Sequence, residues 1–271
     1  QKSGNKVFTA QTMHLIAIVE GQQKNATKTI GWEKQALLLL DENNANENNV
    51  RSTIFATMGK AFMQLNQIDS AIFYNNKAIE NFRSTDDLYN LAITLQRQVN
   101  LLTNKNDLTN AEIILKELSM LNEKIHMGDG DMNYWMAFIN FHIKAKNFNQ
   151  AISLINDRLE KAGDSSERSA TKWGVRLAYF EALAKCYKEQ GNDKQYSIVL
   201  ENILIAKDSL YTINSAEEIA SLQTKYEVQK KENTIIEQEL QLNRKNAYLY
   251  GTLIVFFLIS IMIWLHFRNN S

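Results

Sequence analysis

The chain has 271 residues, its 30 lysines and arginines balance 30 aspartates and glutamates, and it contains one cysteine and no proline. An average proline content of about 5% would give roughly thirteen prolines, so the sequence disfavours proline-rich disorder, collagen and turn-dense all-β folds. The balanced charge offers no basic surface for nucleic acid, and the single Cys186 excludes a disulfide framework and a cysteine-based zinc site.

A pattern of paired helices repeats through the first three quarters of the chain. It is clearest where Gly59 and Phe62 are followed by Ala71. Glycine at this position lets a second helix approach closely, and the aromatic ring and the alanine fill the contact. The other pairs align on this one at Ala17 with Ala36, at Val99 with Ala111, at Trp135 with Ala151, and at Ala184 with Tyr196. We therefore expect five helical hairpins.

This pattern resembles the tetratricopeptide repeat (TPR), a helix-turn-helix unit with a small residue and an aromatic on its first helix and alanines on its second. The resemblance covers about residues 6–210. The period here is about forty residues instead of thirty-four, and the closing proline of the family is missing. The resemblance implies an all-α fold, with a TPR-like superhelix (solenoid) of about five hairpins over residues 1–211 and a concave face.

In the TPR family the inner face of the superhelix is lined by residues of the first helices. Carried onto this sequence, the pattern gives a candidate groove formed by Lys60, Gln64, Gln96, Asn100, Asn140, Lys144, Lys185 and Glu189. Amide and charged side chains suit a peptide backbone or a carboxylate, which indicates a peptide or protein partner. The alternative is an ordinary solvated surface. The Lys/Asn/Arg set of chaperone-binding repeats is not reproduced.

A helical linker rich in Lys, Glu and Gln follows over residues 212–246. Its seam positions follow alternating steps of three and four, as in a coiled coil: Ile219, Leu222, Tyr226, Gln229, Asn233, Ile236 and Leu240. The seam predicts a parallel homodimer. We expect a weak one, because Lys225 would face Lys230 of the second copy and Glu232 would face Glu237. A single helix that leans on the last repeat is the alternative.

Residues 247–267 contain no Asp, Glu, Lys or Arg. About twenty such residues are needed to cross roughly 30 Å of hydrocarbon. Tyr248, Tyr250 and Trp264 lie near the ends of the stretch, where aromatic rings favour the headgroup level. The pattern predicts one transmembrane helix, with residues 268–271 as a truncated tail.

The stretch from Ala206 to Tyr211, together with Ala220 to Glu227, the charged helix and the apolar run, resembles a junction in sensor proteins of Bacteroidetes. In those proteins periplasmic TPRs precede a helical linker, one span of the inner membrane, and a cytoplasmic histidine-kinase or helix-turn-helix DNA-binding output domain. The resemblance implies a membrane-anchored input module that relays a signal to an output domain absent from this chain. A membrane-tethered TPR scaffold without signalling is the alternative.

The sequence contains no phosphate-binding glycine loop, no zinc-protease motif and no nucleophile elbow. The four histidines, His14, His126, His142 and His266, belong to different predicted elements. We therefore expect no enzymatic activity, no cofactor, no metal and no nucleic-acid contact by this chain.

Overall fold

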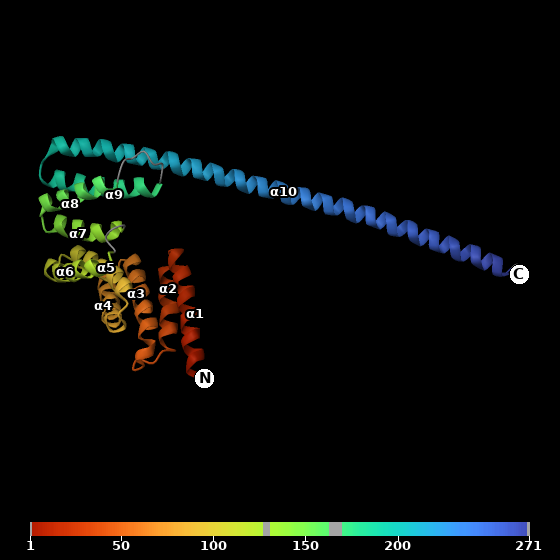
Figure 1. Ribbon diagram of the computed structural model, residues 1–271, viewed down its shortest axis with the longest axis horizontal. Helices are drawn as coiled ribbons and strands as arrows, with labels where there is room; N and C mark the ends of the chain where they lie inside the picture. The colour runs from red at the N-terminus through yellow and green to blue at the C-terminus, as the bar shows by residue number, and fades with distance from the viewer. Residues whose placement is uncertain (1, 127–130, 163–169, 270–271) are drawn as a thin grey trace. The chain divides into compact units, whose positions relative to one another are not determined.

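The computed structural model describes residues 2–126, 131–162 and 170–269, and for residues 2–5, 253, 255–258 and 263–269 it describes the backbone only. These residues form helices joined by turns and contain no strand, which confirms the predicted all-α class (Figure 1). The α-helices are α1 (Lys2–Gln22), α2 (Ala26–Leu37), α3 (Asn48–Gln64), α4 (Ile68–Thr85), α5 (Leu88–Asn104), α6 (Leu108–Ile125), α7 (Met132–Lys144), α8 (Phe148–Lys161), α9 (Ala170–Glu189) and α10 (Asp193–Asn269), with a short 3-10 helix η1 (Ala45–Glu47).

Consecutive helices are joined by turns of one recurring geometry. A residue with positive φ follows α1, α3, α5, α7 and α9 at equivalent places: Lys24 (62°), Asn66 (57°), Asn106 (65°), Lys146 (60°) and Gly191 (67°). The N–H of the next residue then bonds to a carbonyl five residues back, as from Asn192 to Tyr187 at 2.9 Å. This is the Schellman arrangement, which satisfies the last carbonyls of the first helix. Each such turn makes a helical hairpin, and the turns recur about every forty residues.

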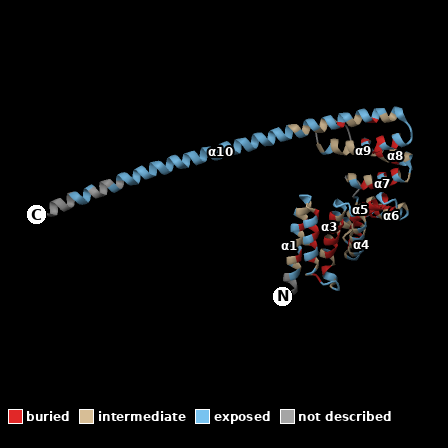
Figure 2. Cartoon of the chain, turned by 180° about the vertical axis from the view of Figure 1, so that it is seen from behind, coloured by how far each residue is buried: buried red, intermediate tan, exposed pale blue. Residues whose placement is uncertain are grey.

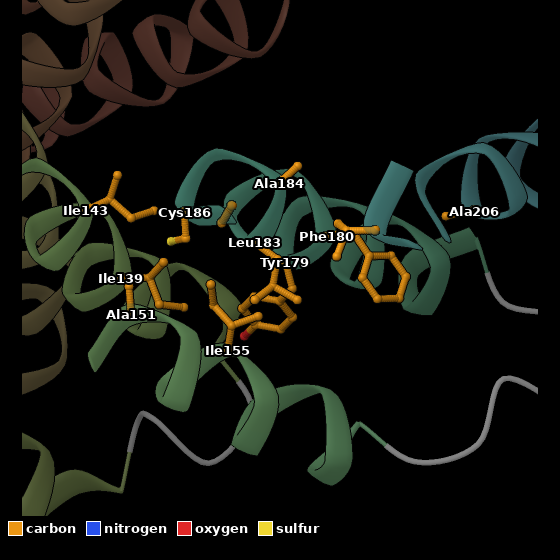
Figure 3. Close-up of a cluster of buried hydrophobic side chains, with 12 residues drawn as sticks. Ile139, Ile143, Ala151, Ile155, Tyr179, Phe180, Leu183, Ala184, Cys186 and Ala206 are labelled. Carbon is orange, nitrogen blue, oxygen red and sulfur yellow. The ribbon is translucent and has the colours of Figure 1, made fainter. Parts of the chain in front are cut away.

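The hairpins bury their apolar stripes between neighbouring helices. One cluster joins α1, α2 and α3 through Ala10, Ile30, Ile54 and Met58. Further along the chain, Ile139, Ile155, Tyr179 and Leu183 of α7, α8 and α9 pack together with Ala206 from the start of α10 (Figure 3). Burying each large aliphatic or aromatic side chain contributes about 1.5–3 kcal/mol. Because each hairpin contacts its neighbours in chain order, these local contacts hold the repeat domain together.

Ion pairs also tie one hairpin to the next. Arg83 of α4 donates from Nε and Nη2 to the two carboxylate oxygens of Glu117 on α6, at 3.0 and 2.6 Å. Lys105, in the turn after α5, contacts Asp69 of α4 at 2.7 Å. Both pairs are at least partly exposed to solvent, so each contributes little to stability. Each pair joins side chains of two consecutive hairpins.

Helix α10 continues without a break from the repeat domain into the predicted linker. The chain divides into two compact units, Gln1–Lys207 and Asp208–Ser271. In the first unit Val199 and Ala206 of α10 are buried, whereas from Ala216 onward every side chain that the structure describes is exposed (Figure 2). The sequence did not indicate that the second helix of the last hairpin and the linker are one helix.

The predicted transmembrane helix over residues 247–267 is not confirmed. Within the part of the chain that the structure describes, no helix combines the length and the hydropathy that a bilayer crossing requires. The side chains at 253, 255–258 and 263–267 of the predicted span lie outside the described residues.

Candidate functional site

A small pocket opens between α1 and α3 in the repeat domain. It has a volume of about 100 Å³ and is lined by apolar groups of Ile18 and Ala61 and by polar groups of Gln22, Thr29, Thr57, Lys60 and Gln64, with Gly21 at its edge. Gly21 brings α1 close to α2, since a Cβ there would lie 3.4 Å from Oγ1 of Thr29. Thr29 already donates to the carbonyl of Ala17, so the amides and the lysine supply the free polar groups. The pocket can accept one side chain or a short piece of peptide backbone.

The structure brings Lys60 and Gln64 of the predicted groove together at this pocket. Both are exposed, and Lys60 has no ion-pair partner among the described residues. The sequence did not predict that the other six lining residues belong to the groove: Ile18, Gly21, Gln22, Thr29, Thr57 and Ala61. A repeat pattern assigns faces to the first helices one at a time, and it did not reveal which residues of α1 meet α3.

Gln96 was predicted to line the groove, but the structure places it in a buried contact with Asp131. It is only 5% exposed, and its Nε2 donates to Oδ2 of Asp131 at 3.0 Å. Asp131 also accepts from the N–H of Asn133 at the start of α7. Gln96 therefore helps to fix the start of α7 and does not line an open groove.

The remaining groove residues lie on later first helices. Asn140 of α7 donates to Asn100 of α5 at 3.4 Å, so these two predicted residues do meet. Lys144, Lys185 and Glu189 are exposed on α7 and α9, and none of them has a described partner. Their side chains are free to bind a ligand, but no described pocket gathers them.

Arg97 of α5 contacts α3 and α4 near the pocket residues of α3, and the sequence did not identify it as a candidate. Its Nη1 donates to the main-chain carbonyl of Ala56 in α3 at 2.9 Å and to Oδ1 of Asn75 in α4 at 3.1 Å. Asn75 is fully buried and packs against Gly59, where an added Cβ would force the Asn75 side chain to move. Thr57 and Lys60 of the pocket follow Ala56 along α3, one and four residues later. Burial lowers the pKa of the Arg97 guanidinium to about 10, so it stays charged at neutral pH.

Two other titratable side chains of the repeat domain, His14 and Cys186, are at least partly buried. His14 contacts Glu33 at 2.7 Å, and the second oxygen of Glu33 is buried without a partner. Burial raises the pKa of the Cys186 thiol to about 11, which leaves it unreactive near neutral pH. Among the described residues, no three His, Cys, Asp or Glu side chains are grouped closely enough to hold a metal ion.

The predicted seam on α10 belongs to the second unit. Ile219 and Leu222 are each 57% exposed, Tyr226 is 69% exposed, and Ile236 and Leu240 are each 54% exposed. Asn233 is exposed as well. The structure contains one copy of the chain, so the homodimer stays a prediction.

Comparison with known proteins identifies the fold. No protein-family model matches this sequence, and no curated protein matches it. Similar solved structures include a kinesin light chain-like protein of Podosopora anserina with nearly identical TPR-like repeats, in two forms. The form that carries a single glutamine-to-methionine substitution has a TM-score of 0.59 and 12% identity over 73% of this chain and 93% of that chain. The second form has a TM-score of 0.58 and 13% identity over 73% of this chain and 94% of that chain.

BtubC (BKLC) of P. vanneervenii is also similar, with a TM-score of 0.59 and 11% identity over 79% of this chain and 90% of that chain. The comparisons give no support to the finer resemblance to sensor proteins of Bacteroidetes. At these identities the likeness shows the fold alone, and that fold is a TPR-like stack of helical hairpins.

Proposed function

We propose that this protein is a protein-interaction scaffold whose repeat domain binds a peptide segment of a partner protein along α1, α3 and α5. The observation that carries the proposal is the pocket between α1 and α3, where Lys60 and Gln64 present polar groups beside Ile18 and Ala61. An amide can both donate to and accept from a peptide backbone, and an ammonium can donate to a carbonyl or a carboxylate. The TPR-like fold supports this proposal because stacked helical hairpins offer extended surfaces for protein partners.

Selection of peptides by the full chain tests the proposal. The immobilised full chain is presented with a display library of random dodecapeptides, and the affinity of each enriched peptide is measured by fluorescence polarisation. A variant with both Lys60→Ala and Gln64→Ala should bind the enriched peptides at least several-fold more weakly. Its melting temperature should change little, because exposed substitutions usually alter stability by less than about 0.5 kcal/mol.

A matched control is a second exposed pair on the same domain. Glu112→Ala with Lys116→Ala removes a solvated i,i+4 pair on α6 at a comparable cost in stability. This variant should bind the enriched peptides as the unmodified chain does. Equal affinities for all three proteins would show that the pocket is not the binding site.

We further propose that α10 tethers the repeat domain to the inner membrane, with the repeats in the periplasm, and passes a signal to an output domain. The support comes from the sequence: residues 247–267 lack Asp, Glu, Lys and Arg, and they follow a charged helix as in the resembled sensors. Carbonate extraction should leave the full chain in the membrane fraction, and release into the supernatant would contradict the tether. Protease should digest the repeats in intact spheroplasts if they lie in the periplasm.

The competing proposal is a tethered scaffold without signalling. The full reading frame separates the two, since an output domain after Ser271 favours the sensor and a stop codon favours the scaffold.

A further inference from the structure

The guanidinium of Arg97 forms hydrogen bonds through one nitrogen only, and the opposite edge of the group forms none to the described residues. Both of its hydrogen bonds, to Ala56 and to Asn75, are donated by Nη1. Its other two nitrogens, Nε and Nη2, make no hydrogen bond to any residue that the structure describes, and neither is a fully buried atom. Each of these two nitrogens therefore keeps some solvent-accessible surface, although the side chain as a whole is largely enclosed.

Among the residues that the structure describes, the charge of Arg97 also has no counter-ion. Its two acceptors are a carbonyl and an amide oxygen, both neutral, and no carboxylate of the described residues lies within ion-pair distance. By contrast, Arg83 pairs with Glu117 and Arg158 pairs with Asp157. A largely buried guanidinium without a counter-ion is costly unless another group neutralises it.

The open edge has the geometry that carboxylates prefer. A carboxylate binds Arg most strongly by two parallel bonds, one from each of two adjacent N–H groups. Arg83 does this within the same chain, since its Nε and Nη2 donate to Oε1 and Oε2 of Glu117 at 3.0 and 2.6 Å. Nε and Nη2 are the same two nitrogens that are open in Arg97.

We propose that Arg97 is a binding residue for a carboxylate, supplied by an Asp or Glu side chain of the partner peptide. Nη1 is anchored on α3 and α4, which fixes the plane of the guanidinium before the ligand arrives. Lys60 adds a second cation one helical turn beyond Ala56 on α3, and it has no described ion-pair partner. This inference rests on the proposed peptide binding and adds the chemical class of residue that the peptide must carry.

Matched peptides test the inference. The display selection on the full chain should enrich Asp or Glu at one position of the selected dodecapeptides. The best such peptide is then compared with a twin in which that residue is replaced by its amide. The unmodified chain should prefer the acidic peptide by about ten-fold or more, as expected for a charge-assisted bidentate pair. Arg97→Gln should reduce this preference to within about two-fold. Arg97→Lys keeps the positive charge but cannot donate two parallel hydrogen bonds, so its preference should lie between those of the unmodified chain and Arg97→Gln.

Arg83→Gln is the matched control, because it makes the same substitution at an arginine that Glu117 already neutralises. It should leave the preference for the acidic peptide unchanged, and circular-dichroism melts should show that all variants are folded. Equal affinity of the unmodified chain for the acidic peptide and its amide twin would overturn the inference, as would a preference that persists in Arg97→Gln. Selection of neutral peptides alone would overturn this inference but leave the proposed function standing. Failure to select any peptide would overturn both.

Discussion

Replacing Gly59 by alanine should destabilise the repeat domain, although alanine is the better helix former. A Cβ at this position would lie 3.1 Å from Cγ of Asn75, 3.4 Å from the carbonyl oxygen of Ala71, and closer still to Oδ1 of Asn75. The side chain of Asn75 must therefore move, and it then loses the hydrogen bond that Arg97 donates at 3.1 Å.

The expected size of the effect follows from three contributions. Overpacking a buried helix contact costs about 1–3 kcal/mol. Loss of a hydrogen bond from a charged donor costs about 1.5–3 kcal/mol. The better helix propensity of alanine offsets about 1 kcal/mol of this loss. We therefore expect Gly59→Ala to lower the free energy of unfolding by about 1.5–5 kcal/mol. For a domain of about 200 residues, this is a fall in melting temperature of about 3–20 °C.

Urea and thermal unfolding of the full chain, followed by circular dichroism at 222 nm, measure this effect. Gly31→Ala in α2 is the control, because a Cβ there meets nothing within 4 Å. It should stabilise the protein by about 0.5–1 kcal/mol. In an Asn75→Ala background the penalty of Gly59→Ala should largely disappear. A penalty of the same size in that background, or no penalty at all, would show that the contact with Asn75 does not set the requirement for glycine.

Two further predictions concern a buried acid and the exposed part of α10. Burial raises the pKa of the Glu33 carboxyl above its usual value, because the charged form is poorly solvated there. The protonated carboxyl therefore stabilises the folded state at low pH, and this stabilisation is lost as the pH rises through the folded-state pKa. Glu33→Gln should therefore be more stable than the unmodified chain in urea titrations at about pH 7 and lose this advantage by about pH 4; an advantage independent of pH would refute the reasoning. In membranes, with Cys186 replaced by Ser, a cysteine at Leu222 should crosslink between copies and one at Gln223 should not; equal yields at both positions would exclude the proposed seam.

The sequence was sufficient to predict the repeats because their signals are local. Gly59 and Ala71 mark a close contact within one hairpin, and Phe62 stacks on Tyr74 at 5.2 Å between the two helices of that hairpin. The turn after each first helix is also local, since one residue in the left-handed conformation and a short run of main-chain bonds define it. Contacts of this kind depend on spacing within about forty residues, which a single sequence displays.

The binding surface was harder to predict because it depends on contacts between hairpins. The repeat pattern placed Gln96 and Asn100 on the inner face, but α5 packs against α4, α6 and α7, and its buried arc extends to Gln96. The neighbouring residue Arg97 lies about 100° further around the helix, where it reaches α3 and α4. The repeat pattern predicts which residues of one helix share a face. The roles of Gln96 and Arg97 depend instead on which neighbouring helix packs against that face.

The same three helices determine both the stability of the stack and the proposed binding of a carboxylate. Arg97 of α5 is anchored on Ala56 of α3 and Asn75 of α4, and Asn75 occupies the space that Gly59 leaves free. In a stack of repeats the stability is approximately a sum of repeat terms and interface terms. A carboxylate that neutralises Arg97 removes an unfavourable charge from the interface between the second and third hairpins, so it should strengthen that interface in particular. Ligand binding at Arg97 would then stabilise the link between neighbouring repeats, and the repeat domain would respond to its partner through a change in how firmly its hairpins stack.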